Sequence, residues 1–308
     1  MGFNLYLAGA EHLVMEKLPP SDCVGKLFTY AAGDKALNKF ITNTVENEPN
    51  TNIFIDSGAF SVHHSGKFID IDQYIEYINR TDGVTIWAEL DTIPYPVLNT
   101  TTALNSSEES WRKYLYMMER VRESEQDKLV PVYHYGEPYE ALERILNTEV
   151  NGRLAPYIAV GGRHGTSKAD NERYFQKMFK IVENSRNPKV KIHAFGMTIM
   201  ELLEKYPFYS ADSTSWLMPG VNGCILTDCL GVVRVSEKSS SNDKNSYWNK
   251  PDSVKKLIKD EVEGYGYDIN ELSKEYRLRH LFNASYFIRW ANNYKFKGKT
   301  GFKRKRLF

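Results

Sequence analysis

Cysteine, net charge and long apolar runs are all scarce in this sequence. Three cysteines in 308 residues are too few for the disulfide framework of a secreted protein, so we expect a reducing cytoplasm. No apolar run approaches the roughly 20 residues that a membrane span needs, and the first residues lack the layout of a signal peptide. The formal net charge of +1 provides no global attraction to polyanions. These absences predict a cytoplasmic protein without a membrane partner.

Eight short apolar runs, rich in β-branched and aromatic residues, follow one another along the chain. Runs of this kind are typical of strands buried on both faces, as in parallel sheets. Helical patterns lie between them. The alternation predicts an α/β protein, namely a (β/α)₈ TIM barrel, and a doubly wound open sheet is the alternative. The expected strands are residues 5–9, 27–31, 53–56, 86–91, 130–134, 157–161, 192–196 and 208–212.

The sequence changes character after Val235. Residues 236–246 are polar and serine-rich, with little to bury. Beyond them we expect one or two helices, at about 252–263 and 270–293. We therefore predict a catalytic barrel over residues 1–235, and over 236–308 a polar loop, a small helical extension and a basic tail. The tail is either solvated or contacts phosphate groups, and its basic residues include Lys303, Arg304, Lys305 and Arg306.

Polar residues end four of the predicted strands: Asp56, Asp91, His134 and Asp212. Catalytic groups of such barrels lie at the carboxyl ends of the strands. One aspartate alone could simply cap the following helix. Three acids around one mouth, however, separate one another's pKa values, so that a nucleophile and a proton donor can coexist. The pattern predicts a carboxylate site for glycosyl transfer or hydrolysis.

Five segments resemble, in order, the motifs of the tRNA-guanine transglycosylase family. The family's Asp-Ser-Gly-Gly-aromatic motif is matched by Asp-Ser-Gly-Ala-Phe, and its Ala-Ile-Gly-Gly loop by Ile-Ala-Val-Gly-Gly. The resemblance covers about residues 50 to 215, and it implies a TIM barrel that exchanges nucleobases. The matching segments are Asp56–Phe60, Leu90–Pro96, Ile158–Gly162, His193–Thr198 and Tyr209–Ser213.

The resemblance also implies roles for individual residues. Asp212 would be the nucleophile that attacks the sugar C1′, expels guanine and forms a covalent ester, and Asp56 would be the general acid/base. Asp91 would recognise the guanine edge. His134 stands where the family has Gln, so it either contacts the base or is a core histidine. The remaining substrate-binding candidates provide stacking (Phe60 and Met197), backbone contacts (Gly161 and Gly162) or membership of the same motifs (Ser57 and Gly196).

The sequence departs from the family at its structural zinc site, which has three cysteines and a histidine. Only Cys224, Cys229 and His280 correspond here, and a fourth ligand is missing. We therefore expect no metal and no cofactor, with these cysteines as buried strand residues.

The compact chain looks most like the branch of the superfamily that inserts 7-deazaguanines into DNA, which includes bacteriophage enzymes that work in a host cytoplasm. The predicted activity is replacement of guanine in DNA by a base such as preQ₀. The alternatives are a tRNA-guanine transglycosylase with the same chemistry, a nucleoside-hydrolysing enzyme, and a non-catalytic nucleic-acid-binding subunit. The sequence does not predict an oligomeric state.

Overall fold

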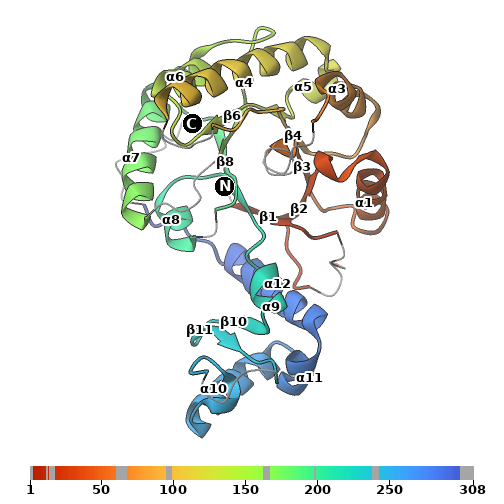
Figure 1. Cartoon of the computed structure of the whole chain (residues 1–308), viewed down its shortest axis with the longest axis vertical. Coiled ribbons are helices and arrows are strands. Elements are labelled where there is room, and N and C mark those ends of the chain that lie inside the picture. Colours follow the sequence, from red (N-terminus) through yellow and green to blue (C-terminus); the bar gives the residue numbers. More distant parts are fainter. Residues whose placement is uncertain are drawn as a thin grey trace, which may run out of the picture.

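Parallel strands curl into a ring with helices outside it, as Figure 1 shows for the computed structural model. The structure describes residues 3–11, 13, 18–59, 68–94, 99–161, 167–197, 199–237 and 243–298. Nine strands form one sheet in the order β5-β4-β3-β2-β1-β9-β8-β7-β6. This confirms the α/β class and a nearly closed barrel with a C-terminal helical part. None of the described helices is long and apolar enough to cross a membrane.

The strands lie close to the predicted runs. They are β1 (Asn4–Ala8), β2 (Val24–Thr29), β3 (Ile53–Asp56), β4 (Ile86–Ala88), β5 (Leu129–Val130), β6 (Val132–His134), β7 (Tyr157–Gly161), β8 (Lys191–Ala194) and β9 (Ser210–Ser213). The helices around them are α1 (Asp34–Asn47), α3 (Ile71–Arg80), α4 (Thr100–Arg120), α5 (Glu123–Gln126), α6 (Tyr139–Asn147), α7 (Lys168–Asn184) and α8 (Met200–Lys205).

The two edge strands of the sheet, β5 and β6, are separated by Pro131 alone. The carbonyl of Val130 accepts a hydrogen bond from the N–H of Glu89 beyond β4, and the carbonyl of Pro131 accepts one from Ala159 in β7, at 3.0 and 2.9 Å. Proline has no N–H to continue the ladder. The N–H of Val132 instead donates to the Glu89 carboxyl group, at 2.6 Å. One predicted strand is therefore two, and the edges of the sheet meet at this point.

Alternate side chains of each strand face the barrel interior or the surrounding helices. The interior cluster takes one set from successive strands, such as Tyr6, Phe54 and Tyr157. The opposite set packs outward, with Leu5 and its neighbours against α6, α7 and α8, and Ile55 against α1, α3 and α4. Both faces are therefore apolar, which explains the continuous apolar runs in the sequence.

A buried ion pair joins β2 to the end of α1. The Lys26 ammonium lies 2.8 Å from a carboxylate oxygen of Glu48, and both side chains are almost fully buried. The ammonium also donates to the backbone carbonyl of Leu13, at 3.2 Å. Through this second bond, Lys26 holds the segment after β1 against the outside of the barrel.

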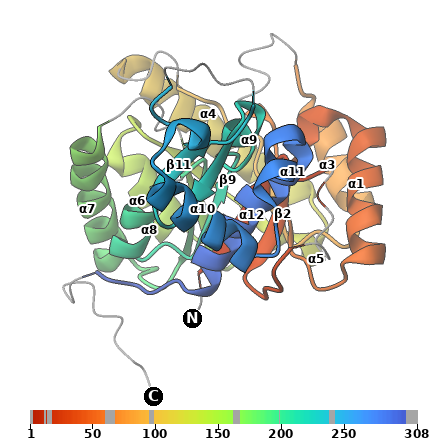
Figure 2. The same cartoon turned by 90° about the horizontal axis from the view of Figure 1, so that it is seen from below.

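The C-terminal part is a small unit with its own core. It contains α9 (Leu217–Val221), an antiparallel hairpin of β10 (Cys224–Thr227) and β11 (Gly231–Arg234), α10 (Asp252–Gly264) and α11 (Ile269–Lys274). The hairpin shares that core with the helices that follow it: Ile225 and Val233 pack with Ile258 and Leu272. The boundary predicted at residue 235 lies inside this packing. Figure 2 looks onto this unit in front of the barrel.

The final helix, α12 (Tyr276–Asn292), returns from this unit to the barrel. We predicted a helix over 270–293, and Glu275 divides it, because its side chain caps α12 by accepting the N–H of Arg277. On the barrel side, Phe287 and Ile288 enter the same core as Leu5 of β1. The helix therefore covers the outer face of β1, and the small unit is inserted between β9 and the helix that completes the barrel wall (Figure 1).

Candidate active site

Three aspartates lie at the carboxyl ends of parallel strands. Asp56 ends β3, Asp91 follows β4 and Asp212 lies in β9. Burial raises the pKa of Asp56, and the charges of Asp91 and Asp212 raise it further, against the lowering effect of backbone N–H donors, to about 7. Since both other carboxylates act on Asp56, the three are within electrostatic range at one rim of the barrel. At neutral pH Asp56 can therefore give or take a proton.

The Asp212 carboxyl group is held on one of its two oxygens. The N–H of Gly196 donates to Oδ1 at 2.7 Å, and Nε2 of His193 lies 3.3 Å from the same oxygen. Gly196 has φ of 61°, in the left-handed region that favours glycine, and this turn aims its N–H at the aspartate. The second oxygen, Oδ2, has no partner among the described residues, so it is the one available to a ligand.

A chain of buried polar groups continues from Asp212 into the barrel. Nδ1 of His193 lies 2.5 Å from Oγ of Ser210, and that hydroxyl is hydrogen-bonded to the hydroxyl of Tyr157. His193 is fully buried, with the rings of Phe54 and Phe195 4.6 Å from its own. Burial lowers its pKa, against the opposing effect of Asp212. From the sequence, His193 was predicted only as part of a motif, and its place in this row of hydrogen-bonded groups was missed.

Asp91 is bound through both of its oxygens. Ser57 donates its hydroxyl hydrogen to Oδ1 at 3.0 Å, and Nε2 of His134 lies 2.8 Å from Oδ2. On the other side of the imidazole, Glu137 lies 3.4 Å from Nδ1 and accepts the backbone N–H of His134 at 2.9 Å. The aspartate is therefore fixed in place by residues of two strand ends.

His134 is a buried cation between two carboxylates. Burial lowers its pKa, but hydrogen bonds and charges from Glu137 and Asp91 outweigh that effect and raise it to about 10. In the structure His134 is a buried partner of Asp91, and its contact with a base stays a prediction. Sequence reasoning missed Glu137, although an acid three residues after a strand-end histidine could have indicated the pair.

Glu89 is a further acid that the sequence argument did not single out. One carboxyl oxygen accepts the N–H of Val132, and the other is buried with no partner in the described part of the chain. Burial raises the pKa of this carboxyl group well above its usual range. Glu89 is bonded to residues on both sides of Pro131, to Val130 through its backbone N–H and to Val132 through its carboxyl group.

Of the other candidate residues, the structure describes Gly161 and Met197 but not the rest. Gly161 ends β7, and a Cβ placed there would lie 3.4 Å from the ring of His134. Met197 is 7 % exposed and belongs to the core that packs the outer helices, so a base could reach it only if that packing changed. Phe60, Gly162 and the basic residues Lys303, Arg304, Lys305 and Arg306 lie outside the described residues.

Of the three residues considered for zinc, Cys224 and Cys229 lie in the small unit, and His280 lies in α12, which packs against α9 and β10 of that unit. Cys224 is buried in β10, Cys229 is partly buried after it, and the ring of His280 packs edge-on against Trp216 and Tyr276. Within the described ranges, no group of three or more His, Cys, Asp or Glu side chains is placed to hold a metal ion.

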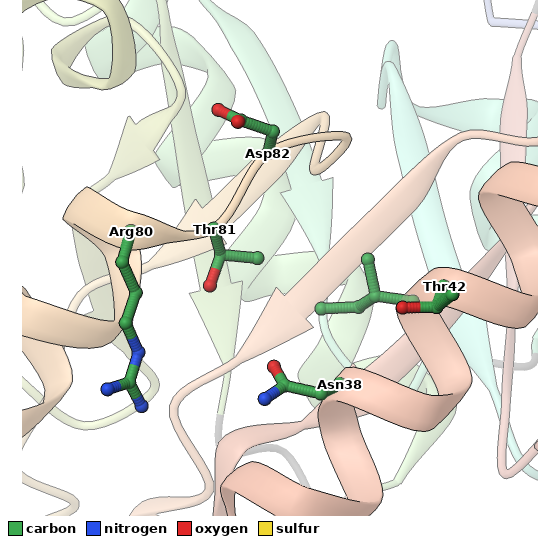
Figure 3. Close-up of a pocket in the computed structure, with 6 residues that line it drawn as sticks. Asn38, Thr42, Arg80, Thr81 and Asp82 are labelled. Atoms are coloured by element: carbon green, nitrogen blue, oxygen red, sulfur yellow. The ribbon is translucent and has the colours of Figure 1, made fainter.

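A separate surface pocket of about 240 Å³ lies between α1 and the end of α3 (Figure 3). Thr81 and Asp82 in its wall precede β4, so it opens near the amino ends of the strands, away from the aspartates. Arg80 in the same wall is paired with Asp34. The pocket therefore shares no residue with the carboxylate site.

The sequence matches no protein-family model and no curated protein. The geometry of the carboxylate site therefore has to support any functional assignment.

Proposed function

We propose that this protein is a base-exchange glycosyltransferase that replaces guanine in DNA with a 7-deazaguanine through a covalent aspartyl–sugar intermediate. With β5 and β6 counted as one strand interrupted at Pro131, the fold is a (β/α)₈ barrel. The observation that carries the proposal is the presence at one rim of Asp56, whose pKa is about 7, and of Asp212, whose Oδ2 has no partner among the described residues while its Oδ1 is held by two donors. A proton carrier and a carboxylate nucleophile at one rim are the two groups that the exchange requires.

In the first step Oδ2 of Asp212 attacks C1′ of the target nucleotide. The bond from C1′ to the base nitrogen breaks, its electron pair leaves with guanine, and protonated Asp56 gives the base a proton. In the second step Asp56 takes the N–H proton of the incoming base. The freed nitrogen then attacks C1′, and the ester to Asp212 breaks. Two displacements replace one difficult displacement of a poor leaving group.

Asp91 would select the base. Its carboxylate is held by Ser57 and by the His134 cation, so its orientation is set before a ligand arrives. A carboxylate accepts two parallel N–H bonds well, and the guanine edge offers such a pair. Because C1′ is inaccessible in a stacked duplex, the target nucleotide would have to leave the base stack to reach this site.

Exchange can be measured with oligonucleotides that carry labelled guanine, as DNA and as tRNA, with preQ₀ as the incoming base. Without preQ₀ we expect guanine release from DNA to stop at about one equivalent per protein, with an adduct on the protein in denaturing mass spectrometry. With preQ₀ present, release should continue as exchange proceeds. Asp212→Asn should lose both signals. Asp252→Asn is the matched control, because this fully exposed aspartate begins α10 in the small unit.

Several results would overturn the proposal. Exchange by Asp212→Asn at the normal rate would exclude the nucleophile. Continued guanine release, beyond about one equivalent per protein and without incorporation of preQ₀, would indicate a hydrolase. Exchange on tRNA alone would show that the substrate is tRNA and not DNA. Inactivity on both polymers would refute the proposed function.

A further inference from the structure

Four polar groups form a single line inside the barrel, from Tyr157 through Ser210 and His193 to Asp212. The strands β7, β8 and β9 that carry them are neighbours in the sheet, and the register places His193 directly beside Ser210. Three of the four residues, His193, Ser210 and Tyr157, lie deep in the barrel, below the rim. Polar groups in an apolar interior cost stability unless each is hydrogen-bonded, and here each one is.

The chemistry of the groups gives this line one direction. A carboxylate only accepts hydrogen bonds, so the imidazole nitrogen beside Asp212, Nε2, carries the hydrogen. In a neutral imidazole the other nitrogen, Nδ1, is then an acceptor, and Ser210 must donate to it. The serine oxygen in turn accepts from the hydroxyl of Tyr157. With the carboxylate at one end, Tyr157 donates to Ser210, Ser210 donates to Nδ1, and Nε2 of His193 points its hydrogen at the aspartate.

We propose that His193 is a positioning residue for Asp212, held as the neutral Nε2–H tautomer by Ser210 and Tyr157. The inference rests on the proposed function, in which Asp212 is the nucleophile. Two donors, the Gly196 N–H and the imidazole N–H, converge on Oδ1. They hold the carboxylate so that Oδ2 faces the sugar. A neutral donor orients the nucleophile without pairing its charge, whereas an imidazolium in the same place would form an ion pair with Asp212 and weaken its attack.

The first test compares His193→Leu with His193→Gln in single-turnover adduct formation. A hydrogen bond to a charged group is typically worth enough to change a rate about 10- to 100-fold. We expect His193→Leu to slow adduct formation by that factor with unchanged half-saturation by the oligonucleotide. The amide N–H of His193→Gln can reach Oδ1, so this variant should recover most of the rate. His280→Gln, at a partly buried histidine of α12, is the control and should react normally.

The result that overturns the proposal is an adduct rate within twofold of the wild type in a folded His193→Leu. Failure of His193→Gln to exceed His193→Leu would exclude N–H donation as the cause. Should His193→Leu not fold, Ser210→Ala replaces it, because it removes the hydroxyl that sets the tautomer and leaves the imidazole in place. We expect a smaller loss there, about 3- to 10-fold, and no loss would overturn the proposal.

The second test is independent of activity. Nitrogen NMR of the ¹⁵N-histidine-labelled protein reads the tautomer of His193 directly, with His193→Gln used to assign its signals. We expect the Nε2–H form at neutral pH, and a change in the balance of tautomers in Ser210→Ala. An Nδ1–H form or an imidazolium would overturn the inference, even in a protein that forms no adduct. Absence of an adduct with the wild type, by contrast, would count against the proposed function alone.

Discussion

Replacing Asp56 by asparagine should stabilise the protein, and the gain should grow with pH. The carboxyl group has a pKa of about 7 in the fold against an ordinary value of 3.8. As pH rises above 3.8 the unfolded chain releases this proton while the folded chain keeps it, so stability falls until pH passes 7 and then levels off. With about 1.4 kcal/mol for each pKa unit, the full cost is about 4 kcal/mol.

The amide side chain of the Asp56→Asn variant would be exempt from this cost, because it does not ionise. Its oxygen can still accept the N–H of Gly58 that the Asp56 carboxyl group now accepts. By pH 5 the unfolded aspartate is already ionised, so part of the gain is present there. Between pH 5 and pH 8 we expect the gain in unfolding free energy to increase by about 3 kcal/mol.

Urea unfolding followed by tryptophan fluorescence, at pH 5 and at pH 8, measures this difference by linear extrapolation. Asp252→Asn serves as the control, because its fully exposed side chain should give the same small effect at both pH values. The reasoning is refuted if Asp56→Asn changes stability equally at pH 5 and pH 8, or destabilises the protein more at pH 8.

Three other predictions test separate parts of the structure. Glu48→Gln leaves the buried lysine of β2 without its counter-charge, so unfolding free energy should fall by about 3 kcal/mol or more in chemical denaturation. Gly58→Ala should lower the stability of the fold more than Gly196→Ala. Both glycines have positive φ, but only at Gly58 would a new Cβ meet neighbours, at 2.5 and 2.7 Å. Equal melting temperatures of the two variants would contradict this. Glu137→Gln should lower the pKa of His134 from about 10, because one of the two carboxylates beside the imidazole is removed. Histidine NMR over pH 6 to 10 measures this pKa. An unchanged titration would show that Glu137 does not stabilise the imidazolium.

The positions of the strands were predictable because buried parallel strands are apolar on both faces. The same property hid which residues face the interior, so the line from His193 to Tyr157 could not be read from the sequence. The aspartates at the strand ends were visible because polar residues interrupt apolar runs. The break at Pro131 could not be predicted, because the carboxyl group that bridges it belongs to Glu89, the residue that follows the neighbouring strand β4. Pairings of this kind depend on register, which a sequence pattern does not contain.

The packing of α12 against β1 constrains how the chain can acquire its fold during synthesis. Leu5 and Leu7 are made long before the helix that shields them, which consists of residues 276–292. Until that helix is made, the first strand presents a bare apolar surface, and a nascent chain in this state is prone to aggregation or chaperone binding. Final closure of the wall therefore waits until residues 276–292 have been made. Truncations before residue 276 should accumulate in inclusion bodies even though every strand of the ring is present.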